Sequence, residues 1–492
     1  MDLLPATLIA LALIVLAGTV FWRGWTLRLR MRALKGEMTE VQREKLALEV
    51  ALAAASNPGD GEAPEPKGER MDILILGGGG REHALAWAVA RSPLCGKLYA
   101  APGNAGIAQV AECAALDPED GAAVAAWCQA HGIGFVIVGP EAPLAAGVVD
   151  ILSEAGILAF GPGREAARLE ASKAFTKEIC DACGAPTAAY ARFTDRAAAL
   201  DYVRAEGAPI VIKADGLAAG KGVVVAMTEA EAEAAVEDML SGAFGEAGAE
   251  VVIEEFMAGE EASFFVLTDG EAVVPLATAQ DHKRAFDGNE GPNTGGMGAY
   301  SPAPVMTAEM ERRALDEIVR PTIVEMARRG TPYKGVLYAG LMIGETGPRL
   351  VEYNARFGDP ECQVLMLRLA TDIVPALVAC AKGTLDDVPM HWAEDPALTV
   401  VMAAEGYPGS YEKGSEIKGL DEAAKVPGVT VFHAGTKAGG DRILANGGRV
   451  LNVSARGETL EEARDRAYAA ISVIDWPEGF WRSDIAWRAL ER

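Results

Sequence analysis

A run of polar side chains near the middle of the chain could bind a metal ion beside phosphate groups. The segment Leu350–Glu361 contains Glu352, Asn354 and Arg356 in a largely apolar stretch. Side chains alternate between the two faces of a strand, so in a strand all three point the same way. Two oxygen ligands suit Mg²⁺, and a guanidinium binds phosphate oxygens in pairs. Because burying these groups without partners would be costly, the pattern favours a functional site.

A second pattern combines lysines with a glycine-rich loop. The expected strand Ile210–Lys213 leads into this loop, which is followed by the β-rich run Val223–Val225. A Walker A loop needs Ser or Thr after its lysine and then a helix, whereas Gly222 and a strand follow Lys221. The sequence therefore predicts a nucleotide site of another architecture, with a flexible loop that closes over phosphates. The loop residues expected there are Gly216, Gly220, Lys221 and Gly222.

The stretch Val251–Met257 predicts a strand that runs into a linker. The backbone of Glu254, Glu255, Phe256 and Met257 could pair with the edge of an adenine ring, and Glu261 could accept ribose hydroxyl groups. Taken alone, the stretch is more typical of an ordinary edge strand, so it indicates a nucleotide site only together with the other patterns.

An anion-binding turn is expected near residue 80. The apolar strand Met71–Leu76 is followed by Gly77–Gly80, Arg81, Glu82 and His83, and then by an alanine-rich helical run. A helix that starts in such a turn offers backbone N–H groups to an anion. The dinucleotide fingerprint is not matched, because Glu82 replaces its third glycine and no acidic residue follows about twenty positions later. A phosphate is therefore favoured over NAD, with a simple tight turn as the alternative.

Further short strands are expected at 97–101, 135–138 and 157–160, each ending in a Gly/Pro loop. These loops are Pro102–Gly106, Gly139–Pro143 and Gly161–Gly163. Strands that alternate with helices predict a parallel α/β domain with ligand loops at the carboxyl ends of the strands.

Composition limits the class of protein. The 492 residues, half of them hydrophobic, are enough for several packed cores. A formal net charge of -25 argues against a nucleic-acid surface, which needs clustered Lys and Arg. Seven scattered cysteines are typical of reduced thiols in a cytosolic setting. The one CxxC, Cys180–Cys183, lies in an expected helix without a second pair at zinc spacing, so it is interpreted as structural.

The first seventy residues predict a membrane tether. Positions 3–22 carry no charge, and about twenty helical residues span the roughly 30 Å core of a bilayer. A cleaved signal peptide is the alternative, but the start carries Asp2 and no typical cleavage site follows. Basic residues from Arg23 to Lys35 place the catalytic body on the cytoplasmic side, anchored to the inner membrane. The expected segments are a transmembrane helix (1–25), an amphipathic helix or coiled coil with heptad spacing (26–55), and a Pro/Gly/Glu-rich linker (56–70).

Together, the motifs of residues 71–492 resemble the ATP-grasp superfamily and, within it, the phosphoribosylamine–glycine ligases. The match runs through Gly77–Ala84, Pro102–Gly106, Gln280–Arg284, Gly291–Tyr300 and Asn354–Glu361, and through Asn446–Val450 near the carboxyl end. Departures are few: Gly78 stands where Asn is frequent, and Cys362 where Thr is usual. The resemblance implies an α/β fold with an N-terminal parallel α/β domain (71–172), an α+β ATP-grasp domain with a mobile lid (173–386, lid about 190–260) and a small mixed C-terminal domain (387–492).

The resemblance also implies a reaction. ATP would phosphorylate the glycine carboxylate, and the amine of 5-phosphoribosylamine would attack the acyl phosphate, giving glycinamide ribonucleotide for purine synthesis. Mg²⁺ or Mn²⁺ would be held by Glu352 and Asn354, and Lys173 and Lys213 would neutralise the ATP phosphates. Arg356, Asp281 and Lys213 would be catalytic. The expected substrate-binding residues are Gly79, Gly80, Arg81, Glu82, His83, Pro102, Gly103, Asn104, Ala105, Gly106, Gly139, Glu141, Asp281, Gly295, Gly296 and Asp359.

Other interpretations stay open at this point. Another ATP-grasp carboxylate ligase, such as a carboxylase, would share Lys213, Glu352 and Asn354 but not the run Gly291–Tyr300. A membrane-tethered nucleotide sensor without turnover is a third possibility, supported only by the tether. His83 and His282 are expected to bind or to support structure rather than to act as bases, and the chain is expected to be a monomer or weak dimer. An internal start at Met71, where chains of this kind normally begin, would give a second, untethered form.

Overall fold

The computed structural model describes residues 69–216, 222–243, 249–386 and 388–492. The predicted transmembrane helix (1–25), the amphipathic helix (26–55) and most of the linker (56–70) lie outside this range, as do Gly220 and Lys221. No helix among the described residues combines the length and the apolar character needed to cross a bilayer.

The first sheet is parallel, as the sequence predicts, with strand order β3-β2-β1-β4-β5. Its centre, Ile73–Leu76 of β1, is completely buried because helices cover both faces. The order reverses between β1 and β4, so the loops that follow these two strands meet at one edge. The strands are β1 (Met71–Gly77), β2 (Cys95–Pro102), β3 (Glu112–Cys113), β4 (Phe135–Val138) and β5 (Ala159–Phe160), with helices α2 (Gly80–Val89), α3 (Gly121–His131), α4 (Glu141–Ala146), α5 (Val148–Glu154) and α6 (Arg164–Ala171).

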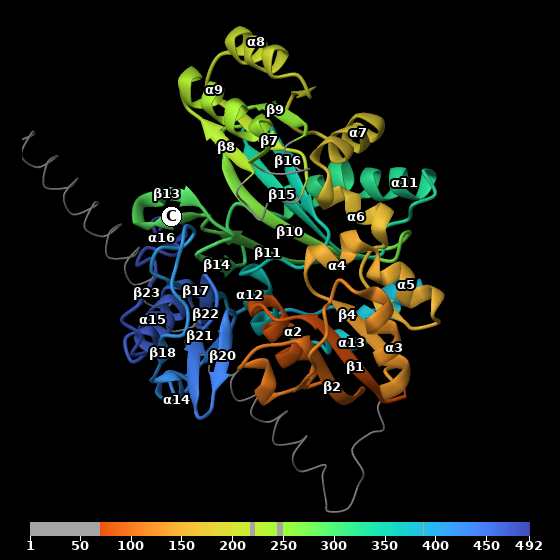
Figure 1. Ribbon diagram of the computed structural model, residues 1–492, viewed down its shortest axis with the longest axis vertical. Helices are drawn as coiled ribbons and strands as arrows, with labels where there is room; N and C mark the ends of the chain where they lie inside the picture. The colour runs from red at the N-terminus through yellow and green to blue at the C-terminus, as the bar shows by residue number, and fades with distance from the viewer. Residues whose placement is uncertain (1–68, 217–221, 244–248, 387) are drawn as a thin grey trace, which may run out of the picture. The chain divides into compact units, whose positions relative to one another are not determined.

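A four-stranded antiparallel sheet with order β6-β9-β7-β8 occupies the region expected to form a lid. It has a hydrophobic cluster of its own, in which Val203 and Val236 from two helices pack on Ile212 and Ile253 from the sheet. Figure 1 shows these helices on one side of the sheet. The elements are β6 (Tyr190–Phe193), β7 (Ile210–Ala214), β8 (Val223–Ala226), β9 (Val251–Glu255), α8 (Arg196–Glu206) and α9 (Glu229–Asp238).

The largest sheet has nine strands and order β16-β15-β10-β11-β14-β17-β22-β19, with β23 beside β17. Strand β14 pairs with β17 from Gly298↔Val400 to Ser301↔Ala397, so the sheet runs continuously past the domain boundary expected near residue 387. Its strands are β10 (Glu260–Thr268), β11 (Val273–Asp281), β14 (Gly298–Ser301), β15 (Gly335–Gly344), β16 (Gly347–Asn354), β17 (Ala397–Ala404), β19 (Val429–His433), β22 (Arg449–Arg456) and β23 (Gly479–Phe480).

The remaining elements connect and cover these sheets. Helix α12 packs against both α2 and β14, so it joins the parallel sheet to the large one. The helices are α7 (Lys173–Cys183), α10 (Ala308–Arg313), α11 (Arg320–Arg328), α12 (Glu361–Arg368), α13 (Ile373–Lys382), α14 (Leu420–Ala423), α15 (Leu460–Ile471) and α16 (Trp487–Leu490). The short strands are β12 (Arg284–Phe286), β13 (Glu290–Asn293), β18 (Glu416–Ile417), β20 (Thr436–Gly439) and β21 (Arg442–Ala445).

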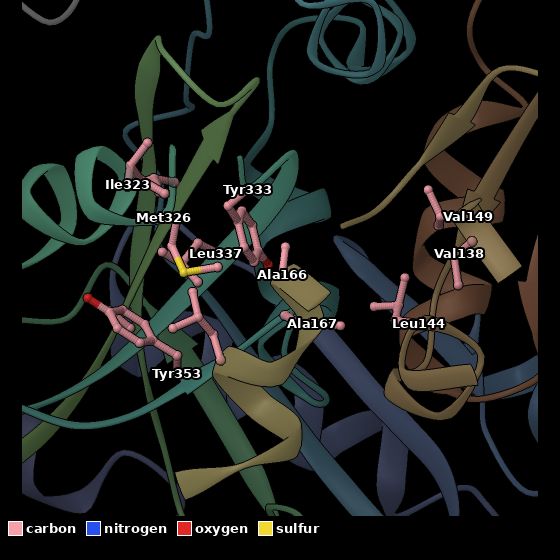
Figure 2. Packing of buried hydrophobic residues seen from close by; sticks show 14 of the residues in the cluster. Val138, Leu144, Val149, Ala166, Ala167, Ile323, Met326, Tyr333, Leu337 and Tyr353 are labelled. Atoms are coloured by element: carbon pink, nitrogen blue, oxygen red, sulfur yellow. The ribbon is translucent and has the colours of Figure 1, made fainter. Parts of the chain in front are cut away.

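One hydrophobic cluster extends from the parallel sheet to the large sheet. Figure 2 shows Met326 of α11 beside Leu337 of β15 and Tyr353 of β16, and Leu144 of α4 near Val138 of β4. Burial of such side chains contributes roughly 1.5–3 kcal/mol each. The cluster therefore fixes β16, the strand that carries the predicted metal ligands, against the rest of the fold.

Three strand predictions differ from the structure at their ends. The strand expected at 157–160 is only β5, and the one expected at 251–257 ends at Glu255. Strand β16 ends at Asn354, so the prediction that Arg356 belongs to the same strand is wrong. Gly358 and Pro360 follow closely, and such residues end a strand. All seven cysteines are free, and Cys180 and Cys183 lie in α7 as expected.

Candidate active site

The turn between β1 and α2 is organised by Glu82. Its Oε2 accepts a hydrogen bond from the Gly79 N–H at 2.7 Å, which caps the helix, and Arg81 donates to Oε1. A Cβ at Gly77 or Gly139 would collide with this buried carboxylate, so glycine is required at both loops. The Arg81 guanidinium also donates to the Phe357 carbonyl at 3.1 Å. Glu82 therefore holds the two loops together and occupies the Gly79 N–H, so an anion at this helix N-terminus would meet the following backbone donors, beginning with the Gly80 N–H.

Asn104 fixes the loop Pro102–Gly106 by using its whole side-chain amide. Nδ2 donates to the carbonyls of Gly78 and His433 at 2.9 and 2.8 Å. Oδ1 accepts from the N–H groups of Gly106 and Ile107, both at 2.9 Å. These four bonds exhaust an amide. Among the predicted substrate residues, Asn104 is thus occupied within the protein, while Gly103 takes a φ of +69° and Ala105 is buried.

Both histidines considered as bases take part in contacts within the protein. His83 Nδ1 accepts a hydrogen bond from the His433 N–H at 2.8 Å, and burial, together with His433, lowers its pKa to about 3. His282 Nε2 accepts from the Ala486 N–H at 2.9 Å, and burial lowers its pKa to about 3 as well. Neutral rings that serve as acceptors in this way favour the structural interpretation of both residues.

Arg356 lies beyond the end of β16 but still reaches the predicted metal ligand on that strand. Its NH2 donates to Asn354 Oδ1 at 3.0 Å and lies 2.8 Å from Glu170 Oε1. Its Nε is 3.4 Å from Glu141 Oε2. Burial alone would raise the pKa of Glu141, but Arg356 and Arg81 lower it to about 2. The guanidinium is therefore held between two carboxyl groups of the first domain, Glu141 and Glu170, and the neutral amide of Asn354 on the strand.

Glu352 and Asn354 are two residues apart on β16 and so lie on the same face, as predicted. Burial raises the pKa of Glu352, but Lys283, Lys213 and Lys173 together hold it below its ordinary value. No group of three or more His, Cys, Asp or Glu side chains at metal-binding spacing occurs in the described part of the chain. A carboxylate and an amide oxygen suit a hard cation that takes its other ligands from phosphate and water. The donor set therefore fits Mg²⁺ or Mn²⁺ bound together with a nucleotide.

Two of the predicted phosphate-binding lysines point toward this strand. Lys213 Nζ donates to the Val351 carbonyl at 3.0 Å and lies 2.9 Å from Glu254 Oε2. Lys173 Nζ donates to the Gly216 carbonyl at 2.9 Å, and burial lowers its pKa although Glu352 opposes the shift. Gly222 is buried next to β8. The structure thus brings Lys173, Lys213 and Glu352 into one cluster of charges.

The predicted adenine stretch is partly engaged in other contacts. Glu254 is buried between lysines, whereas Glu255 forms an ion pair with Arg349 at the end of β9. Phe256 is exposed and Met257 is buried. Their backbone, rather than the Glu254 side chain, can thus meet an adenine edge.

Two further site residues each place a carboxylate near the same lysine, Lys283. Glu261 forms an ion pair with Lys283 at 2.5 Å, and Asp281 ends β11 two residues before that lysine. Burial, with Glu361 and Glu261, raises the pKa of Asp281 to about 7 against the opposing charge of Lys283. Asp281 therefore keeps its proton to a higher pH than an ordinary carboxyl group, and an ammonium group bound nearby would favour its ionised form.

The loop Gly295–Gly296 is held from the far end of the chain. Arg449 of β22 donates to the carbonyls of Gly295 and Asp359, both at 2.6 Å, and its NH2 lies 3.2 Å from Asp359 Oδ2. Asp359 Oδ1 also accepts from Gln363 at 2.8 Å. Arg449 therefore fixes the relative position of two predicted substrate-binding loops.

Several of these residues were missed by reasoning from the sequence. Lys177, Glu170, Lys283 and Arg449 all contact predicted site residues, yet none was itself predicted to belong to the site. Lys283 and Arg449 did lie in the quoted motifs Gln280–Arg284 and Asn446–Val450, which is the signal that could have indicated them. Lys177 follows Lys173 by four positions in the run Ser172–Lys177, a spacing that places both on one face of a helix, whereas Glu170 carried no such signal.

Comparison with known proteins places this site in a family. Three family models match the chain: the N domain of phosphoribosylglycinamide synthetase at 71–170, its ATP-grasp (A) domain at 171–362 and its C domain at 397–488. The phosphoribosylamine–glycine ligase of Mesorhizobium japonicum is 60% identical over 422 residues, which cover 86% of this chain and 99% of that relative. The chloroplastic enzyme of Arabidopsis thaliana is 56% identical over 420 residues, covering 84% of this chain and 79% of the relative.

Two solved structures also match the fold of this chain. The crystal structure of phosphoribosylamine–glycine ligase from Thermotoga maritima matches with a TM-score of 0.73 and 32% identity, covering 84% of this chain and 99% of that one. The biotin carboxylase domain of a 2-oxoglutarate carboxylase from Hydrogenobacter thermophilus matches with a TM-score of 0.65 at 18% identity, covering 84% of this chain and 92% of that one, and so shares the fold alone. Since three family models and relatives above half identity agree over residues 71–488, the chain belongs to the phosphoribosylamine–glycine ligase family.

Proposed function

We propose that the chain joins glycine to 5-phosphoribosylamine with ATP, giving glycinamide ribonucleotide, ADP and phosphate through a glycyl phosphate, as a step of purine synthesis. The observation that carries this proposal is the family membership, with relatives of the same name at 55–60% identity across the catalytic body. The geometry is consistent with it, because Glu352, Asn354 and Arg356 meet on one side of β16.

The nucleotide phosphates would meet Lys213 and Lys173 beside β16, where both ammonium groups already lie near Glu352. Arg356 would stabilise charge on the transferring phosphoryl group and on the tetrahedral centre formed when the amine attacks. Because Glu170, Glu141 and Asn354 hold this guanidinium in place, it needs little reorganisation when charge develops. Preorganised donors of this kind contribute several kcal/mol to a transition state.

Glu352 and Asn354 would hold Mg²⁺ or Mn²⁺, and such an ion neutralises phosphate charge when it is bound. Glu352 is ready for this role because neighbouring cations keep its carboxylate ionised.

The sugar phosphate would lie at the helix N-terminus formed by Gly79 and Gly80, beside the loop that Asn104 fixes. Glycine would lie near Asp281 and the loop Gly295–Gly296, whose position depends on Arg449. An ionised Asp281 would attract the glycine ammonium group and leave its carboxylate toward the nucleotide.

The activity is tested with the purified full-length chain in a mild detergent. ADP release should require ATP, a divalent cation, glycine and phosphoribosylamine together. ADP release that needs bicarbonate instead of glycine would support the carboxylase alternative, and nucleotide binding without release would support a sensor.

We also propose that residues 3–22 tether the enzyme to the inner membrane with its catalytic body in the cytoplasm. Support comes from the uncharged run and its basic flank, which are sequence features. Carbonate-washed membranes of the native host should retain the full-length chain. Recovery of the chain only in the soluble fraction would contradict the tether.

A further inference from the structure

Three ionisable side chains from different elements meet in the interior beside β16. Lys177 comes from α7, Lys213 from β7 and Glu254 from β9, and each is at most 3% exposed. Glu254 Oε1 lies 3.3 Å from Lys177 Nζ, and its Oε2 lies 2.9 Å from Lys213 Nζ. One carboxylate thus bridges two buried ammonium groups, and this charge triad carries one net positive charge.

The two lysines differ in how their protons are used. An ammonium group has three donors. Lys177 donates to Thr187 Oγ1 at 2.8 Å and to the Ala188 carbonyl at 3.2 Å, and it forms an ion pair with Glu254. Lys213 donates to the carbonyl of Val351, next to the predicted metal-binding position 352, and forms an ion pair with Glu254. Within the described residues, the ammonium group of Lys177 therefore has three protein acceptors around it and that of Lys213 has two.

Stability alone is a weak reason for such an arrangement. Buried ion pairs often contribute nothing net, because desolvation offsets their attraction, and apolar replacements can be equally stable. A better-founded consequence of the arrangement is that the Glu254 carboxylate has a fixed orientation. It cannot turn toward Lys213 alone while Lys177 holds its other oxygen. Without Lys177, Glu254 would neutralise Lys213 fully.

We propose that Lys177 is a positioning residue for the ligase reaction: by sharing Glu254 it keeps Lys213 both oriented and incompletely neutralised for the phosphates of ATP. This inference rests on the proposed function of the site and deepens it. It assigns Lys177 no contact with the substrate. It also gives the Glu254 side chain a role inside the protein in place of the expected one toward adenine.

The test compares Lys177→Met, Glu254→Gln and the double variant in the full-length chain. Lys177→Met leaves the triad neutral, so the KM for ATP should rise about 10-fold while the KM for glycine stays within about twofold. Glu254→Gln leaves both cations, so the KM for ATP should not rise, but kcat should fall about 10-fold because Lys213 loses its fixed partner. The double variant restores one net positive charge, so its KM for ATP should return to within about threefold of wild type.

Arg368→Met is the matched control, since this buried cation of α12 donates to Ser301 Oγ at 2.8 Å and to the Ala393 carbonyl at 2.9 Å. It should lower the melting temperature and leave the KM for ATP unchanged. An unchanged KM for ATP in Lys177→Met, or additive losses in the double variant, would overturn the proposal. If Lys177→Met does not fold, the Glu254→Gln variant alone tests the proposal. A raised KM for ATP in Glu254→Gln would contradict the charge argument. Wild type without glycine-dependent ADP release would instead refute the proposed function.

Discussion

Asp281 offers a measurable link between the site and the stability of the chain. Burial raises the pKa of this carboxyl to about 7, with Glu361 and Glu261 adding to the effect and Lys283 opposing it. An asparagine has nearly the shape of the protonated carboxyl but cannot ionise. Asp281→Asn should therefore remove one titration from the folded state and leave its packing unchanged.

The sign of the effect follows from proton binding. Between the ordinary pKa of 3.8 and about 7, the unfolded chain has released this proton and the folded chain still holds it. The free energy of unfolding therefore falls as the pH rises through this range: the contribution is complete below the unfolded pKa and lost above the folded one. At 1.36 kcal/mol per pH unit the full loss is about 4 kcal/mol. Because solvent reaches Asp281 in part, we expect about 2 kcal/mol.

Urea unfolding of the ligand-free chain at about pH 5 and about pH 8 measures the effect. Because pH 5 already lies above the unfolded pKa, the stability of Asp281→Asn minus that of wild type should increase by about 1 kcal/mol between these values and then level off. Other groups, including His83 and His282, titrate in both chains and cancel in the difference. Parallel stability curves would refute the argument that burial raises this pKa. Turnover of the variant should fall at least about 100-fold, since it cannot attract an ammonium group.

Three further substitutions test the remaining assignments. Glu352→Gln removes one of two predicted metal ligands, so turnover should fall at least about 100-fold. The free energy of unfolding in urea should fall by less than about 2 kcal/mol. Activity within about twofold of wild type would contradict the metal assignment. Asn104→Ala leaves the buried carbonyls of Gly78 and His433 without donors, so the free energy of unfolding should fall by about 2–3 kcal/mol. An unchanged urea midpoint of unfolding would mean that the loop is held in another way. Arg449→Lys keeps the charge but loses the forked guanidinium that reaches Gly295 and Asp359. The KM for glycine should therefore rise about 10-fold, while the KM for ATP stays within about twofold. Equal changes in the two KM values would disprove a local role of Arg449.

Local patterns predicted the parts of the fold that are set locally. The strands at β1, β4 and β7 agree with their apolar runs, and the glycine turn after β1 does start a helix. The alternation of side chains along a strand correctly placed Glu352 and Asn354 on one face, but this alternation does not show where the strand ends. Arg356 lies outside β16 and reaches Asn354 from the following turn. Its closeness to Asn354 was therefore predicted correctly, but from the wrong assumption that both residues belong to one strand.

Contacts between distant parts of the chain could not be predicted in this way. His433 donates to His83, 350 positions away, and Arg449 reaches Gly295 over 154 positions. Hydrophobic periodicity describes which face of an element is buried but not its partner. The pairing of β14 with β17, which brings the C-terminal strands to the site, is of the same kind. The residues missed from the sequence are therefore mostly those that join separate elements.

The charge balance of the site explains how so acidic a chain could bind ATP. The chain has a formal net charge of -25, yet the cations near β16 are held by carboxylates: Lys213 by Glu254, and Arg356 by Glu170. These cations therefore combine fixed positions with only a small excess of positive charge, such as the one net charge of the Lys177–Lys213–Glu254 triad, and phosphates must compete with carboxylates that are already in place. A divalent ion on Glu352 and Asn354 would shift this competition toward the phosphates. A requirement for such an ion would thus follow from how the site is held together, in addition to the chemistry of phosphoryl transfer.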